Sequence, residues 1–127
     1  MEGYLIRTPS AKATWTLIAV NLVIGFATFL LKYVDPRSFE EIIIAFSAVP
    51  AYTILGREPY RLITSMFLHG GFLHLFLNMF SLFIFGPDVE RVLGRPRYLL
   101  LYFLSGLAAD YAHAYFILTF YPIRRLL

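Results

Sequence analysis

Polar side chains inside an otherwise apolar stretch are the residues of this sequence that could do chemistry. His74 and Asn78 lie four residues apart in a run, residues 62–87, that contains no Asp, Glu, Lys or Arg. Side chains at positions i and i+4 share one face of a helix, so their hydrogen-bond donors can converge on one point. His69 lies five residues before His74, so it is predicted to face elsewhere. Two such donors in a cavity of low dielectric would suit an oxyanion in acyl transfer. From these two residues alone, a second interpretation is equally open, namely that both bridge neighbouring helices.

The elements that must position these donors are membrane-spanning helices. Of the 127 residues, 59% are hydrophobic, 18% aromatic and only 15% charged, and three apolar runs approach the roughly 20 residues needed to cross a bilayer. We therefore predict an all-α, multi-pass integral membrane protein with one membrane-embedded domain over residues 1–127. Its predicted parts are spans at about 14–31, 64–86 and 97–120 and a long loop at 32–61.

The first span has a competing interpretation as a secretory signal peptide, with Arg7 and Lys12 as its basic region. No small-residue cleavage pattern follows it, so a retained helix is favoured. Asn21 lies inside this span and is predicted to form an interhelical hydrogen bond. In the loop, Ser38 and Glu41 have the spacing of a capping box. They precede an amphipathic helix whose apolar face contains Phe39, Ile42, Ile43 and Phe46.

Composition also excludes several classes of function. The sequence has no cysteine, which removes thiolate nucleophiles and zinc–thiolate sites. The formal charge of +3 comes from basic residues scattered between apolar segments, which is typical of membrane anchors rather than of a nucleic-acid surface. We expect no cofactor, no metal and no nucleic-acid partner.

A wider motif surrounds the two donors. It comprises a histidine with two glycines, a second histidine, an asparagine one turn later, then a glycine, a glutamate four residues on and a final glycine: His69, Gly70, Gly71, His74, Asn78, Gly86, Glu90 and Gly94. This motif strongly resembles that of the rhomboid family of intramembrane serine proteases. Tyr60-Arg61 before it, and Tyr102 and Ser105-Gly106 after it, match the family's pattern as well.

By this resemblance, His74 and Asn78 stabilise the oxyanion, Glu90 is a structural anchor in the turn between two helices, and Arg61 is a structural loop residue. The fold implied is the first half of a rhomboid bundle. The family's serine lies in a Gly-x-Ser-Gly motif that opens a fourth helix, and its general-base histidine lies on a sixth. Neither is present in this sequence, so we expect a truncated N-terminal portion that contains no catalytic nucleophile or base and is inactive alone.

Two function classes follow from the resemblance. The favoured one is a serine endopeptidase that hydrolyses peptide bonds in transmembrane substrates. The alternative is a non-catalytic pseudoprotease or membrane scaffold that binds transmembrane clients. The partners implied are the lipid bilayer, transmembrane substrates or clients, and a C-terminal rhomboid half.

Three substitutes for the missing residues can be weighed from the sequence. Ser105-Gly106 echoes the serine motif, but Phe103 stands where its first glycine belongs, so a packing role is favoured. Asp110 and His113 are one turn apart and would pair in acid–base chemistry, although a satisfied polar pair is more common. A zinc site from His69, His74, Asp110 and His113 lacks metal-ligand spacing.

Overall fold

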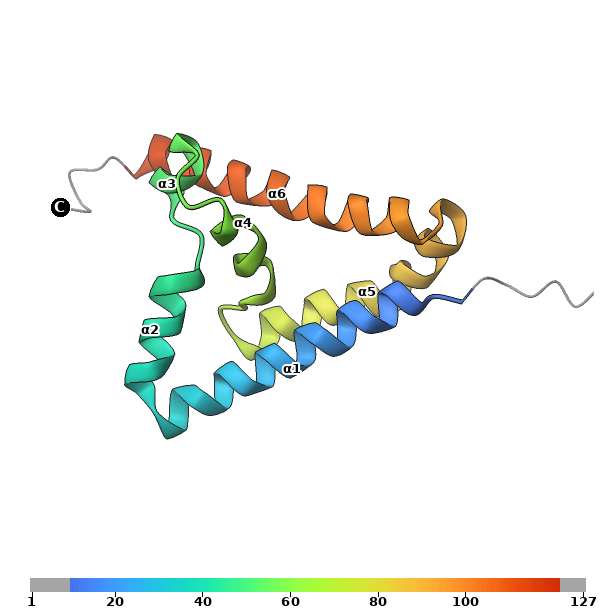
Figure 1. The fold of residues 1–127 in the computed structure, drawn as a ribbon, viewed down its shortest axis with the longest axis horizontal. Coiled ribbons are helices and arrows are strands. Elements are labelled where there is room, and N and C mark those ends of the chain that lie inside the picture. The colour runs from blue at the N-terminus through green and yellow to red at the C-terminus, as the bar shows by residue number, and fades with distance from the viewer. Residues whose placement is uncertain (1–9, 122–127) are drawn as a thin grey trace, which may run out of the picture.

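The computed structural model describes residues 10–121, and this part of the chain is helical without strands (Figure 1). Arg7 lies outside the described residues. Six α-helices and one 3-10 helix follow in order: α1 (Lys12–Val34), α2 (Pro36–Phe46), α3 (Pro50–Leu55), α4 (Tyr60–Thr64), η1 (Ser65–Phe67), α5 (Phe72–Leu93) and α6 (Arg95–Phe120). The predicted all-α class is confirmed.

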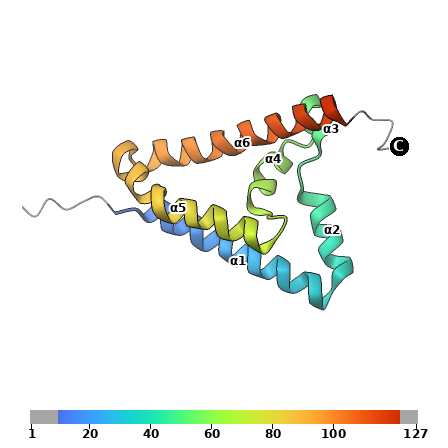
Figure 2. The ribbon, with the colours of Figure 1, turned by 180° about the vertical axis from the view of Figure 1, so that it is seen from behind.

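Helices α1 and α5 pack against each other and lie side by side in both views (Figures 1 and 2). Gly25 of α1 allows this close approach, because a Cβ at that position would come within 2.5 Å of a Leu75 methyl carbon. The rings of Trp15 and Phe83 meet further along the pair, with centroids 5.9 Å apart. Small residues at helix contacts are typical of membrane bundles, in which packing replaces the hydrophobic effect as the driving force between helices.

Gly94 reverses the chain between α5 and α6. Its φ of +81° lies in the left-handed region that favours glycine. From this turn α6 spreads away from the α1–α5 pair, and α4 lies in the space between them (Figures 1 and 2). Helix α3 packs on the far end of α6. The loop between the first and second long helices therefore holds the bundle open at this end.

Helix α5 runs further than the sequence indicated. The second span is predicted to end at about residue 86, but the helix continues through Pro87 to Leu93. Proline removes one backbone N–H while its fixed φ remains compatible with a helix. The residues beyond it are held against α1 by Glu90. The connection to α6 consequently shrinks to Gly94.

The loop helix α2 begins earlier than predicted, and its cap is Asp35. The Asp35 carboxylate accepts hydrogen bonds from the Ser38 backbone N–H at 3.3 Å and from the Ser38 hydroxyl at 2.6 Å. The hydroxyl bond lowers the pKa of Asp35. Pro36 occupies the first turn, where a missing N–H costs nothing. The predicted capping box from Ser38 to Glu41 is therefore wrong, because Ser38 lies inside the helix, whereas the amphipathic helix itself is present.

By length and composition, three segments can cross a membrane: Lys12–Val34, Pro36–Leu55 and Phe72–Leu93. The predicted number is matched, and the first and third overlap the predicted spans at 14–31 and 64–86. The second lies in the predicted loop, where the structure divides it into α2 and α3 at residues 47–49. Helix α6 covers the span predicted at 97–120 with 26 residues, yet it is not among the three, because Asp110 and His113 lower its hydropathy.

Candidate functional site

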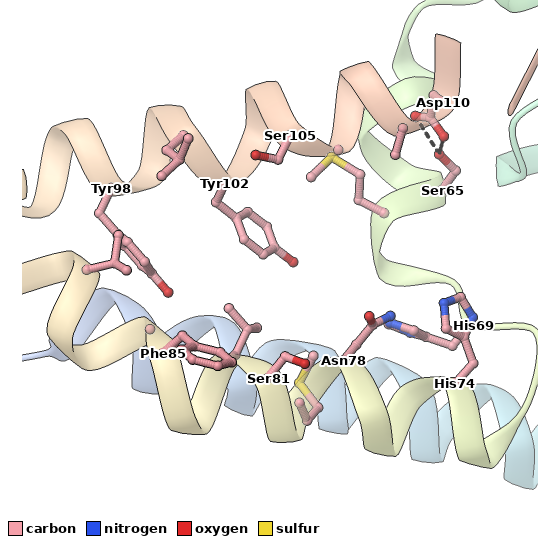
Figure 3. Close-up of a pocket in the computed structure, with 18 of the residues that line it drawn as sticks. Ser65, His69, His74, Asn78, Ser81, Phe85, Tyr98, Tyr102, Ser105 and Asp110 are labelled. Carbon is pink, nitrogen blue, oxygen red and sulfur yellow. Dashed lines mark hydrogen bonds between the residues drawn. The ribbon is translucent and has the colours of Figure 1, made fainter. Parts of the chain in front are cut away.

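The α5 wall of a cavity carries the predicted donors. His74 and Asn78 come from successive turns of α5 and line a cavity of about 580 Å³ between α5 and α6 (Figure 3). Both side chains are exposed in the described part of the chain. Their four-residue spacing on a regular helix brings them to the same face, as expected. The geometry leaves both amide and imidazole donors open to a group that enters the cavity.

His69 belongs to the same cavity. The sequence suggested that it faces elsewhere, because it lies five residues before His74. That inference was wrong, because α5 begins at Phe72 and helical spacing does not apply to the bend before it. The His69 and His74 rings meet edge to face with centroids 5.4 Å apart, and His69 Nδ1 is buried without a hydrogen-bond partner among residues 10–121.

The opposite wall of the cavity comes from α6. Tyr98, Tyr102, Ser105 and Asp110 line it, as Figure 3 shows. The Asp110 carboxylate accepts a hydrogen bond from the Ser65 hydroxyl of η1, at 3.3 Å to Oδ2. Asp110 is therefore a tether between α6 and the loop. Within the described residues no hydrogen bond or ion pair joins it to His113, which is exposed.

The structure also bears on the zinc alternative. Across residues 10–121, no group of three or more His, Asp or Glu side chains comes together in a way that could hold a metal ion. His69 and His74 are adjacent, but Asp110 has Ser65 as its partner. The side chains named for a zinc site are thus not brought together as one set.

Glu90 connects the end of α5 to the beginning of α1. Its side chain is 2% exposed. Oε2 accepts from the Ala13 backbone N–H at 3.0 Å, and Oε1 accepts from the Thr14 N–H and hydroxyl at 2.7 and 2.8 Å. These N–H groups belong to the first turn of α1, which has no intrahelical acceptors and carries the positive end of the helix dipole. Arg95 Nε lies 3.9 Å from the same carboxylate.

The resemblance predicts Glu90 as a structural anchor within the turn between two helices. The hydrogen bonds go instead to α1, because residues 86–93 are themselves helical and have no free N–H groups to offer. Gly86 takes part indirectly. A Cβ at Gly86 would lie 2.6 Å from a Thr14 methyl carbon, so the glycine lets α1 approach close enough for the Glu90 contacts.

Arg61 organises the loop by binding the C-terminal end of α2. Its Nη1 donates to the carbonyls of Ile44 and Ser47, at 2.5 and 3.1 Å, and its Nε donates to Glu58 Oε2 at 2.7 Å. The hydrogen bond to Glu58 raises the pKa of the Arg61 guanidinium above its already high usual value. Arg61 thus connects α4 to α2 as a fixed cation.

Two further α4 side chains complete this attachment. The Tyr60 hydroxyl donates to the Ala45 carbonyl at 3.1 Å, and the Thr64 hydroxyl donates to the Phe46 carbonyl at 2.7 Å. The last carbonyls of a helix have no intrahelical donor. Here the carbonyls of residues 44–47 all accept from α4, so the Tyr60-Arg61 pair has a structural explanation. Gly70 and Gly71 have no such explanation, since no heavy atom lies within 4 Å of a Cβ built at either position.

Sequence reasoning missed two residues that the structure brings to the site. Thr14 contributes two of the three hydrogen bonds to Glu90, and Ser65 binds Asp110. A signal for this contact was available in the sequence. The backbone N–H groups in the first turn of α1, including that of Thr14, need an acceptor from outside the helix. Asn21 does form the predicted interhelical bond, with Nδ2 donating to the Tyr102 hydroxyl at 3.2 Å.

Comparison with known proteins is consistent with this arrangement. A family model described as a rhomboid domain matches residues 56–123, more than half of the chain. The chain belongs to the rhomboid family. As a rhomboid with three segments able to cross a bilayer, it is an integral membrane protein. The match covers α4, α5, all of α6 and the whole histidine, asparagine and glutamate motif.

Several rhomboid proteases are similar in sequence. Rhomboid protease GluP of Bacillus subtilis is 34% identical over 113 residues, which cover 89% of this chain and 22% of that protein. Rhomboid protease AarA of Providencia stuartii is 32% identical over 103 residues, 80% of this chain and 36% of the relative. Rhomboid protease GlpG of Haemophilus influenzae is 28% identical over 96 residues, 76% of this chain and 50% of the relative.

The chain therefore spans half or less of the length of each of these relatives. No solved structure gave a significant match.

Proposed function

We propose that this chain supplies the oxyanion-stabilising part of a rhomboid intramembrane serine protease, with His74 and Asn78 as the donors. One observation carries the proposal: both side chains line the same open cavity between α5 and α6 (Figure 3). Donors fixed on a rigid helix cost no reorganisation when negative charge develops on a carbonyl oxygen. The match to the rhomboid family and the similarity to rhomboid proteases support the proposed reaction class.

The reaction is hydrolysis of a peptide bond in a transmembrane substrate. A serine oxygen attacks the carbonyl carbon while a histidine takes the serine proton, and the carbonyl oxygen becomes the oxyanion held by His74 and Asn78. The histidine then protonates the leaving amine, and water releases the acyl group from the serine. The 127 residues contain no Gly-x-Ser-Gly motif. In this proposal the serine and base come from rhomboid sequence outside them, on the same polypeptide or on a second one.

The proposal includes a membrane arrangement in which α1, α5 and α6 cross the bilayer and the segment from α2 to η1 is a connecting loop. A helix of 26 residues is about 39 Å long at 1.5 Å per residue, enough for the hydrocarbon core. Because the chain reverses at Gly94, α6 returns toward the side on which α5 begins. Asp110 is compatible with this path, since its carboxylate is hydrogen-bonded to Ser65 rather than turned to lipid.

The test is cleavage of a reporter transmembrane substrate by the whole chain, alone and co-expressed with the C-terminal helices of the Haemophilus influenzae relative, which would carry the serine and base. We expect no cleavage by the chain alone and measurable cleavage by the pair. Asn78→Ala should reduce the rate of the pair by about 10²–10³. Leu77→Ala is the matched control, because Leu77 is exposed on α5 but does not line the cavity.

Strong cleavage by the chain alone would overturn the proposal and redirect attention to Ser105 and Asp110. A pair that assembles without cleaving would favour the alternative of a non-catalytic rhomboid that binds transmembrane clients. Equal rates for the pair with Asn78→Ala and with wild-type chain would remove the oxyanion role.

A further inference from the structure

The α6 wall of the cavity contains a tyrosine whose hydroxyl is oriented by a buried amide. Asn21 of α1 is fully buried, and its Nδ2 donates to the Leu17 carbonyl at 2.8 Å and to the Tyr102 hydroxyl at 3.2 Å. Tyr102 lines the cavity opposite Asn78, and its hydroxyl points into the space between α6 and α5 (Figure 3). A residue of α1 thus fixes a polar group in the wall of the candidate site.

The direction of this hydrogen bond decides what the tyrosine can do next. A backbone carbonyl only accepts, so the amide nitrogen of Asn21 must face Leu17, and the same nitrogen faces the phenol oxygen. The Tyr102 oxygen is therefore an acceptor in this contact, and its hydrogen is left to donate elsewhere. Among residues 10–121 the hydroxyl donates no hydrogen bond that would use it.

A second tyrosine hydroxyl on the same wall has no hydrogen-bond partner at all among the described residues. Tyr98 lies one turn before Tyr102 on α6 and also lines the cavity. Its side chain is 4% exposed, and its hydroxyl has no hydrogen-bond partner within the described part of the chain. A buried hydroxyl without a partner costs about 1–3 kcal/mol. The Tyr98 hydroxyl is buried within the described part of the chain, so the unused donor that this wall offers to a group in the cavity is the Tyr102 hydroxyl.

The remaining lining of the cavity indicates what carries that acceptor. Most of it is apolar, from residues such as Leu82, Phe85 and Leu101, and Ser105 on α6 leaves room for a close neighbour. An apolar surface with a few hydrogen-bond donors and small residues is the contact surface that membrane helices use with each other. An acyl chain would match the apolar lining but would leave the Tyr102 hydroxyl without an acceptor.

We infer that Tyr102 is a positioning residue that holds a membrane-spanning helix in the cavity, by donating a hydrogen bond from its hydroxyl to a serine or threonine hydroxyl or a backbone carbonyl on that helix. The inference rests on the proposed function, in which the helix bearing the serine fills this cavity. The Tyr102 oxygen already accepts a hydrogen bond from Asn21, which leaves the phenol hydrogen for the incoming helix. The α6 wall thereby aligns that helix against His74 and Asn78.

The experiment measures association separately from cleavage. The whole chain is reconstituted in bicelles with the C-terminal helices of the Haemophilus influenzae relative, whose general-base histidine is replaced so that no cleavage intervenes. Association is followed by energy transfer between labels on the two polypeptides. Tyr102→Phe should weaken it about 3- to 20-fold, the range of single hydrogen bonds between membrane helices. Asn21→Leu should have a smaller effect in the same direction.

Tyr111→Phe is the matched control, because it removes the same hydroxyl from an exposed position of α6 that does not line the cavity. It should associate as wild type does. The unfolding midpoint of the isolated chain separates positioning from folding, and Tyr102→Phe should change it little, since Asn21 keeps its bond to the Leu17 carbonyl.

If the wild-type chain associates with the C-terminal helices and Tyr102→Phe associates equally strongly, this inference is overturned and the proposed function stands. Absence of association for the wild-type pair overturns both. Retention of a phospholipid that is lost in Tyr102→Phe, with association unchanged, would assign the cavity to lipid instead and overturn the inference.

Discussion

Glu90→Gln should destabilise the protein by about 2–4 kcal/mol. The carboxylate accepts three hydrogen bonds from Ala13 and Thr14 while only 2% exposed. Glutamine is nearly the same size but replaces one acceptor oxygen with an amide donor, so at least one α1 backbone N–H would face another donor. A buried N–H without a partner costs about 1–3 kcal/mol, and loss of charge from the remaining bonds costs about 1 kcal/mol more.

The assay is equilibrium unfolding in detergent micelles, titrated with sodium dodecyl sulfate and followed by fluorescence. The chain has one tryptophan, Trp15, which lies beside Thr14 and against Phe83 of α5. Its emission therefore reports on separation of α1 from α5 at the place where Glu90 acts.

Asp88→Asn is the matched control, because it makes the same chemical change two residues away on an exposed side chain. Asp88 is paired with Arg91 at 3.4 Å, but its side chain is 83% exposed, and exposed pairs of this kind contribute about 0–1 kcal/mol. A Glu90→Gln variant within about 0.5 kcal/mol of the wild type, or no more affected than Asp88→Asn, would refute the anchoring argument.

Three further changes have defined outcomes. Gly86→Ala should cost about 1–3 kcal/mol in the same titration, because its Cβ would lie 2.6 Å from a methyl carbon of α1 and 2.9 Å from the Tyr98 hydroxyl; a wild-type midpoint would contradict this. Arg61→Ala should free the C-terminal carbonyls of α2 and speed amide hydrogen exchange in α2 and α4, measured by mass spectrometry, whereas unchanged exchange would exclude the attachment. Asn21→Leu should lower stability by about 0.6 kcal/mol and by no more than about 1.7 kcal/mol, the range for one polar contact between membrane helices.

The sequence predicted the fold class well, because hydrophobic runs are a local signal. Apolar runs located the long helices, and the four-residue spacing of His74 and Asn78 placed them on one face without knowledge of the tertiary structure. An interhelical hydrogen bond of Asn21 was predicted for a similar reason, since an amide inside an apolar helix needs a partner. The structure identifies that partner as Tyr102 of α6.

The partners of the charged and polar residues were harder to predict, because they are distant in sequence. Glu90 binds residues 76 and 77 positions away, and Asp110 binds Ser65, 45 positions away. Nothing local distinguishes these pairings from contacts inside a turn. The orientation of His69 failed for a different reason, because helical spacing was extended across the start of α5. The prediction of the site was limited by where each helix begins and ends, and not by whether the helix exists.

The bond between Glu90 and Thr14 also has a consequence for the synthesis of the protein. Its two ends are separated by 76 residues, so at about 5–20 residues per second the first turn of α1 would wait roughly 4–15 s for its acceptor to leave the ribosome. During that interval the N–H groups at the start of α1 must be satisfied by water or lipid headgroups at the membrane surface. The beginning of the first helix is therefore one of the last parts of the bundle to reach its native contacts.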